Sequence, residues 1–200
     1  ESPFEVYYND FDQNGKNDIV LTYYNYGIQY PLRGFSCSAQ QVPEIKDKFM
    51  KYDVFASLDV NNVYGDLLNN SLNYQATYFS SAILTNLGSG DFMVNKLPVR
   101  AQFSSVNDFL VGDYNKDDIN DILLIGNMHH SEIETPRNDA GIGALFLGSE
   151  SGEYTFSPVN QSGFFTPGDA KKMIEVKTND GTIILVANNN DVLQSFIKTK

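Results

Sequence analysis

The chain has 200 residues and a formal net charge of −11 at pH 7, with 42% hydrophobic and 13% aromatic residues. The acidic balance argues against nucleic acid as a partner, because phosphate binding needs clustered Lys and Arg. No run approaches the roughly 20 apolar residues of a membrane-spanning helix. Twelve Tyr and fourteen Phe without any Trp favour a globular, β-rich protein.

Short runs rich in β-branched and aromatic residues predict strands, and turn signals such as Asn14-Gly15 and Asn179-Asp180-Gly181 separate them. In chain order the runs are Phe4–Tyr8, Asp18–Tyr24, Tyr74–Leu84, Phe109–Gly112, Asp121–Gly126, Ala144–Leu147, Met173–Val176, Thr182–Ala187 and Val192–Ile197. Their even distribution is typical of blades of antiparallel sheet.

Residues 38–75 differ from the rest and predict a helical insertion packed on one face of a sheet. Val42, Ile45, Phe49 and Met50 have helix-like spacing, with Pro43 near the start. Further short helical pieces are expected at 54–58 and 63–68, with Leu67, Leu68 and Leu72 as an apolar stripe. A partner-binding role for this insertion is a second interpretation.

Similar segments recur along the chain. Ile19-Val20-Leu21, Ile122-Leu123-Leu124 and Ile183-Ile184-Leu185 each follow a turn-rich loop, and Pro98-Val99 recurs as Pro158-Val159 at an offset of 60. A unit of about 60 residues predicts a repeat architecture. We therefore expect a single partial β-propeller over 1–200, all-β with a helical insertion, with about three four-stranded blades. The expected blades cover about 1–100 (with the insertion at 38–75), 101–160 and 161–200.

The first of two acidic loops runs from Asp10 to Asp18 and is followed by an apolar run. Oxygen side chains stand at loop positions 1, 3, 5 and 9, the pattern that a hard cation such as Ca²⁺ requires in a tight loop. The predicted ligands are the side chains of Asp10, Asp12, Asn14 and Asp18 and the main-chain carbonyl of Lys16. Gly15 permits the sharp turn.

The second acidic loop has the same pattern 103 residues later. Its predicted ligands are the side chains of Asp113, Asn115, Asp117 and Asp121 and the main-chain carbonyl of Ile119. Asp118 stands where the first loop has Gly15, and Asp tolerates a left-handed backbone better than most residues. Up to two structural Ca²⁺ ions are therefore expected.

Two other interpretations of these loops are less favourable. An EF-hand needs a bidentate Glu at position 12, where Leu21 and Leu124 stand within strand-like runs. Metal-free hairpin turns would leave three Asp close together and repelling one another in each loop. The corresponding third segment, Lys177–Gly181, lacks these ligands and predicts a plain, metal-free hairpin.

The pattern Asp10-x-Asp12-x-Asn14-Gly15-x-x-Asp18 with its following strand resembles the FG-GAP repeat of integrin α chains and of VCBS-type proteins related to cartilage acidic protein. The stretches 101–108, 134–140 and 161–169 resemble the C-terminal part of large bacterial VCBS-repeat proteins. This resemblance implies a secreted or surface-attached β-propeller with calcium in its blade hairpins, at the periplasm or outer membrane of a bacterium.

The expected function is a calcium-stabilised, non-catalytic binding or adhesion module outside the cell, with a protein or glycan ligand. Residues 129–142 and the insertion at 38–75 are candidate recognition segments. A carbohydrate-active enzyme on a propeller scaffold and a purely structural segment are the alternatives. His129, His130, Glu132 and Glu134 are the one group that invites a zinc or catalytic role, but adjacent histidines on an extended segment point to opposite sides, so a solvated loop is expected.

The ends and the single cysteine add two expectations. The chain opens with Glu1-Ser2-Pro3 and about three blades would not close, so we expect a piece of a longer protein. Open blade edges invite pairing with other chains, and self-association is expected unless further blades cover them. Cys37 cannot form an intramolecular disulfide and is predicted to be a small buried hydrophobic residue.

Overall fold

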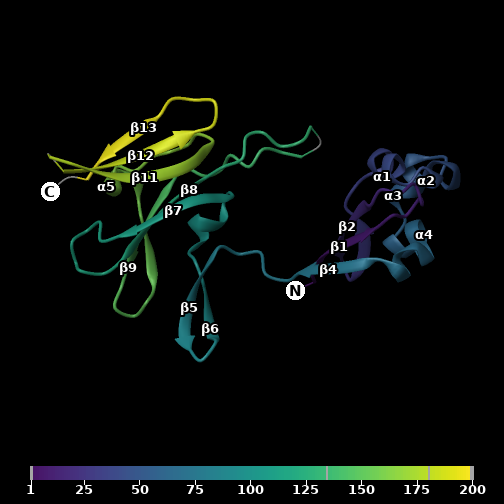
Figure 1. Ribbon diagram of the computed structural model, residues 1–200, viewed down its shortest axis with the longest axis horizontal. Coiled ribbons are helices and arrows are strands. Elements are labelled where there is room, and N and C mark those ends of the chain that lie inside the picture. Colours follow the sequence, from purple (N-terminus) through teal and green to yellow (C-terminus); the bar gives the residue numbers. More distant parts are fainter. Residues whose placement is uncertain (1, 134, 180, 199–200) are drawn as a thin grey trace. The chain divides into compact units, whose positions relative to one another are not determined.

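The computed structural model describes residues 2–133, 135–179 and 181–198 (Figure 1). The chain divides into two compact units, Glu1–Phe79 and Ser80–Lys200. Antiparallel sheets of two to four strands dominate, and helices are concentrated between Phe35 and Asn70. The predicted β-rich class with a helical insertion is therefore confirmed.

The first unit contains a four-stranded antiparallel sheet in the order β3-β2-β1-β4. Its strands are β1 (Phe4–Asn9), β2 (Asp18–Asn25), β3 (Ile28–Pro31) and β4 (Leu72–Ala76). Side chains alternate across the sheet, so that along β2 Asp18, Val20 and Thr22 are buried whereas Ile19 and Tyr23 are exposed.

Short helices cover one face of this sheet (Figure 1). They are α1 (Phe35–Gln41), α2 (Glu44–Lys48), α3 (Tyr52–Ala56), α4 (Val60–Tyr64) and the 3₁₀ helix η1 (Gly65–Asn70). Asp59 caps α4 by accepting a 2.8 Å hydrogen bond from the N–H of Asn62. Val42, Ile45 and Val60 pack with Val20 of β2 in one buried cluster, as predicted for a helical insertion packed on a sheet.

The insertion differs from its prediction at its ends and at its cysteine. Helical structure runs from Phe35 to Asn70 and not over 38–75, and Leu72, expected in a helical stripe, lies on β4. Long-range pairing decides this, because Leu72 stands opposite Tyr8 of β1. Cys37 is half-buried on α1, so the prediction that it is buried is wrong.

The second unit contains three sheets. Strands β7 (Val106–Gly112), β8 (Asp121–Gly126), β9 (Ala144–Gly148) and β10 (Tyr154–Ser157) form an antiparallel meander in sequence order. A second sheet comprises β11 (Ala170–Thr178), β12 (Gly181–Asn188) and β13 (Gln194–Ile197), and a hairpin comprises β5 (Ala82–Gly88) and β6 (Asp91–Lys96). The 3₁₀ helix η2 (Val99–Gln102) and the short α5 (Val159–Ser162) lie in the connections.

Every residue of β8 is buried, because apolar side chains pack on this strand from both sides. Leu123 and Ile125 pack with Met173, Ile184 and Val186 of the β11–β13 sheet. On the other face Ile122 and Leu124 pack with Leu97, Ala101 and Phe146, and Ile83 of β5 lies against this cluster. In the second unit the β11–β13 sheet therefore packs on one face of the meander, and Leu97, Ala101 and Ile83 pack on β8 from the other side.

One predicted strand is wrong, and three observed strands were not predicted. The run Tyr74–Leu84 is divided between β4 and β5, and the side chain of Gln102 binds the main chain of Ser81, just before β5. The side-chain oxygen of Gln102 accepts the N–H of Ser81 at 2.7 Å, and its amide donates to the carbonyl of Ser81 at 3.0 Å. Strands β3, β6 and β10 were missed, and β5–β6, assigned by the repeat analysis to the same blade as the N-terminal residues, belongs to the second unit.

Candidate metal centre

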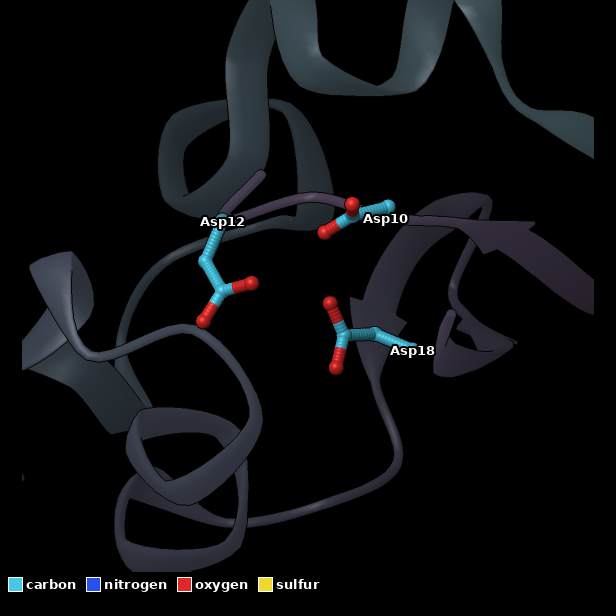
Figure 2. Close-up of side chains that lie close together, drawn as sticks. All are labelled: Asp10, Asp12 and Asp18. Carbon is cyan, nitrogen blue, oxygen red and sulfur yellow. The ribbon is translucent and has the colours of Figure 1, made fainter. Parts of the chain in front are cut away.

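The first acidic loop joins β1 to β2 and brings three carboxylates together. Asp10 and Asp12 lie on the loop, and Asp18 is the first residue of β2. One carboxylate oxygen from each lies within 4.8 Å of the others, and Figure 2 shows the three side chains pointing toward a common centre. The fold therefore brings together the three carboxylates of the predicted ligand set of the first loop.

Hydrogen bonds within the loop fix these side chains. Asp10 accepts the N–H groups of Asn14 and Gly15 at 2.9 and 2.8 Å. Asn14 in turn accepts the N–H of Lys16 at 2.8 Å and donates its amide to Asp12 at 2.8 Å. The backbone has positive φ at Gln13 and Gly15, which turns successive N–H groups inward. Lys16, whose main-chain carbonyl is a predicted ligand, is fixed in this turn by the hydrogen bond from its N–H to Asn14.

The pKa of the Asp18 carboxyl is raised above its ordinary value, in part because the neighbouring carboxylates repel it. Burial raises the pKa of its carboxyl, a hydrogen bond from the N–H of Phe11 at 3.1 Å opposes this, and the charges of Asp12 and Asp10 raise the pKa further. A bound divalent cation would remove this repulsion. Carboxylate and amide oxygens are also the ligands that Ca²⁺ prefers, so the donor set fits this ion.

The second acidic loop joins β7 to β8 with the same backbone hydrogen bonds. The N–H of Tyr114 donates to Asp121 at 2.8 Å, as that of Phe11 does to Asp18. Asp113 accepts the N–H groups of Asp117 and Asp118 at 3.2 and 3.1 Å, the contacts that Asp10 makes in the first loop. The hairpins also share their register, because Tyr8 pairs with Ile19 and, 103 positions later, Val111 pairs with Ile122.

Positions 3 and 5 exchange residue types between the loops. In the first loop the Asn14 amide donates to Asp12, and in the second the Asn115 amide donates to Asp117, both at 2.8 Å. The same bond is kept while the amide and the carboxylate change places. Each loop therefore carries three carboxylates and one amide at its four predicted side-chain positions.

In the second loop Asp118 takes the positive φ that glycine has in the first loop. Asp118 has φ +66° where Gly15 has φ +85°, and Lys116 has φ +67° where Gln13 has φ +57°. Asp118 thus adopts the left-handed conformation that Gly15 adopts in the first loop. The N–H of Ile119, whose carbonyl is a predicted ligand, donates to Asp117 at 2.9 Å.

The second loop differs in how its carboxylates are placed. Over residues 2–133, 135–179 and 181–198, the first loop holds the one group of three acidic, His or Cys side chains whose ligand atoms all lie within 4.8 Å. Asp121 is fully buried, and both of its oxygens accept N–H groups, from Tyr114 at 2.8 Å and Gly148 at 2.9 Å. The carboxylates of the second loop are therefore not gathered around one point as those of the first loop are.

A lysine also lies at the second loop. Lys198 donates its ammonium to the main-chain carbonyl of Asp113 and lies 4.8 Å from the ring centroid of Tyr114. Desolvation raises the pKa of the Asp113 carboxyl, but N–H donors from Asp118, Lys116 and Asp117, together with the Lys198 charge, bring it below its usual value. Protein groups thus supply part of the positive potential that a cation would supply.

Among the described residues of the third segment and of the histidine segment, no three acidic, His or Cys side chains lie close enough together to hold a metal ion. Strands β11 and β12 pair up to Thr178 and Gly181, which fits the predicted hairpin, and Asp180 lies outside the described residues. His130 is 71% exposed, as expected of a solvated loop, whereas His129 is half-buried. Glu132 accepts a hydrogen bond from Thr135, and Glu134 lies outside the described residues.

A buried polar cluster around Asp169 was missed by the sequence analysis. Asp169 is 3% exposed and contacts Lys171 at 2.5 Å, His130 at 3.6 Å and the Asn189 amide at 3.1 Å. Desolvation raises its pKa, but the hydrogen bonds from Lys171, Asn189 and the main chain of His129 and the Lys171 charge lower it to about 2. Because three of these partners lie 20 to 40 positions away in the chain, no local pattern pointed to this cluster.

Nothing in the described part of the chain indicates a catalytic function, and no described helix is long and apolar enough to cross a membrane. Comparisons with known proteins add no assignment. No family model matches the chain, and no curated protein and no solved structure matches it.

Proposed function

We propose that this chain is a calcium-stabilised, non-catalytic binding module of the FG-GAP/VCBS type that works outside the cell. The observation that carries the proposal is the convergence of Asp10, Asp12 and Asp18 in a hairpin loop. Its support is the recurrence of the same hydrogen bonds, register and carboxylate count in the second hairpin. Two hairpins with three carboxylates each and the same hydrogen bonds are expected if both bind the same ligand.

In the first loop Asp10, Asp12, Asn14 and Asp18 would hold the ion with the main-chain carbonyl of Lys16. In the second loop Asp113, Asn115, Asp117 and Asp121 would do so with the carbonyl of Ile119. The ion supplies positive charge between carboxylates that otherwise repel one another. The residues themselves position the strands, because Asp18 is both a ligand candidate and the first residue of β2.

A propeller arrangement is part of the proposal. Each blade of a propeller is a four-stranded antiparallel sheet, and β7–β10 form such a meander in sequence order. Within the second unit the β11–β13 sheet packs on one face of this meander. The recurrence of the β1–β2 hairpin as β7–β8 supports blades of one repeating type.

The calcium affinity expected of such loops supports the proposal that the protein works outside the cell. Loops of extracellular modules bind Ca²⁺ with dissociation constants of about 10⁻⁴ to 10⁻³ M, and we place the two loops in this class. A structural ion of this affinity would be bound outside a cell and largely absent in cytosol. Ligand recognition, of a protein or a glycan, would fall to 129–142 and to the helical insertion.

The direct test is thermal unfolding of the whole chain with Ca²⁺ or with EGTA. A ligand that binds the folded state alone stabilises it by about 2.7 kcal/mol at a hundredfold excess over Kd. Calorimetric titration should give one tighter site and one weaker site. Asp12→Asn should weaken the tighter site, and Glu150→Gln, which removes an exposed charge outside both loops, should leave it unchanged. An equal melting temperature with Ca²⁺ and with EGTA would refute the proposal.

A further inference from the structure

The second unit contains a cleft lined by the meander β7–β10, the short helix α5 and the β11–β13 sheet. Its volume is about 810 Å³, which falls within the roughly 300 to 1,000 Å³ of small-molecule sites. Leu123 and Leu145 of the meander and Ile184 of β12 form part of its wall and belong to the buried core of the unit. The cleft is therefore built within one unit, with an apolar wall supplied by that unit's own core.

Three aromatic rings line the cleft, and neighbouring groups hold each of them in place. The ring centroids of Phe164 and Phe196 lie 4.8 Å apart. Tyr114 is fixed at both ends, because its hydroxyl donates to Glu175 at 2.9 Å and its N–H donates to Asp121 at 2.8 Å. Aromatic rings offer a flat apolar surface, and rings that are already fixed lose little freedom when a ligand binds.

Polar side chains without protein partners lie beside these rings. Ser157, at the end of β10, is 7% exposed, and its hydroxyl takes part in no hydrogen bond within the described part of the chain. The exposed side-chain amides of Asn160 and Gln161 on α5 likewise have no hydrogen-bond partner among the described residues. A buried hydroxyl without a partner costs free energy unless a ligand or a water satisfies it. The cleft therefore offers one buried and two exposed polar groups to a ligand.

The charge of the lining restricts the kind of ligand. None of the 16 described residues that line the cleft is acidic, although the chain has 25 Asp and Glu among its 200 residues. Lys198 is the one cation among them, and it already donates to the main-chain carbonyl of Asp113 and lies 4.8 Å from the ring centroid of Tyr114. A cationic ligand would therefore find no carboxylate, and an anionic ligand would meet a chain of net charge −11. A wholly apolar ligand would leave the Ser157 hydroxyl unpaired.

We propose that this cleft binds a neutral sugar. A pyranose ring has apolar C–H faces that suit aromatic rings, and hydroxyls around its edge that can pair with Ser157, Asn160 and Gln161. The inference deepens the proposed function: it rests on that function for the role of the protein as a binding module, and it does not rest on calcium. It adds a site apart from 129–142 and the helical insertion.

The first test is saturation-transfer NMR of the whole chain with the methyl glycosides of glucose, galactose, mannose and N-acetylglucosamine, followed by calorimetric titration. We expect at least one of them to bind with a Kd of about 1 mM. The corresponding uronate, which adds a carboxylate to the same ring, should bind more weakly. The absence of binding by all four sugars, or a uronate that binds more tightly than its neutral parent, would overturn the inference.

A pair of matched variants tests the position of the site. Gln161→Ala should raise the Kd about threefold to tenfold, because it removes a hydrogen bond to the sugar. It keeps the main-chain hydrogen bond from residue 161 to Pro158. Gln40→Ala removes an exposed amide from α1 in the first unit and should leave the Kd unchanged. Equal effects of the two variants would contradict the assignment of the sugar to this cleft.

Two further measurements use the wild-type chain. In chemical-shift mapping the sugar should move the amide resonances of 157–163 and 195–197, and shifts confined to 129–142 or to the helical insertion would overturn the site. Sugar titrations and thermal unfolding in Ca²⁺ and in EGTA separate this inference from the calcium proposal. A calcium-dependent melting temperature without sugar binding would overturn the cleft ligand alone. Sugar binding with a melting temperature that calcium does not change would support the cleft and refute the calcium proposal.

Discussion

The hydroxyl of Tyr114 donates a 2.9 Å hydrogen bond to the carboxylate of Glu175 on β11. The main-chain N–H of the same tyrosine donates to Asp121 at 2.8 Å. One residue at position 2 of the second acidic loop therefore joins the loop to the neighbouring sheet. In the first loop the equivalent Phe11 donates its N–H to Asp18 and buries its ring in the helical core, 6.2 Å from Tyr64.

Tyr114→Phe tests this connection. The variant keeps the ring and the backbone hydrogen bond and loses the bond to Glu175, so we expect unfolding to become easier by about 1 kcal/mol. Denaturant unfolding measures the loss. Tyr154→Phe, which removes a hydroxyl on β10 from the same unit, is the matched control and should have a smaller effect. Equal effects of the two variants would mean that the Glu175 bond contributes nothing to stability.

Asp and Asn change places between loop positions 3 and 5 of the two acidic loops, and this predicts that a second substitution restores calcium binding lost by a first. Asp12→Asn leaves two carboxylates among the predicted side-chain ligands and should weaken calcium binding in the first loop. Adding Asn14→Asp restores three carboxylates in the order found in the second loop and re-forms the amide–carboxylate bond in reverse. We expect the double variant to bind calcium more tightly than the single variant in calorimetric titrations. A double variant as weak as the single one would show that position, and not carboxylate number, sets the affinity.

The left-handed backbone at Asp118 predicts opposite responses to two substitutions. Asp118→Gly should change the free energy of unfolding by less than about 1 kcal/mol, because relief of the positive φ is offset by greater freedom of the unfolded chain. Asp118→Val should destabilise by about 1 to 3 kcal/mol, because a β-branched residue resists this conformation. Chemical denaturation in EGTA isolates the backbone effect from metal binding. A harmless Asp118→Val would contradict the positive φ of this residue.

The low pKa of Asp169 predicts how its contribution depends on pH. The folded pKa of about 2 lies below the ordinary value of 3.8, so the ionised form is favoured in the folded state. The resulting stabilisation is present above pH 3.8 and is lost as pH falls through about 2. Asp169→Asn should therefore destabilise by on the order of 2 kcal/mol at pH 7.

Urea unfolding of wild type and Asp169→Asn at a series of pH values checks the sign of this dependence. The gap between the two proteins should shrink as the solution is acidified below pH 3.8. A constant gap down to pH 2 would assign the loss to altered packing around the buried side chain and not to its charge.

The two acidic loops and the helical insertion are features that the sequence by itself determined. Asp10 and Asn14 organise N–H groups no more than five residues away, so the nine-residue pattern contains its own hydrogen-bond partners. The apolar spacing of Val42, Ile45 and Phe49 likewise predicts residues of the helical core, although only Ile45 lies within a helix and Met50, expected in the same stripe, is exposed.

Only the tertiary structure decided features that depend on residues far apart in the chain. Leu72 is a strand residue because it pairs with Tyr8, and Asp169 is buried among groups contributed by three separate segments. Ile19 and Ile122 occupy equivalent places in the same motif, yet one is exposed and the other buried. Local sequence sets the conformation of a hairpin, whereas the burial of its faces depends on which other layers pack on it.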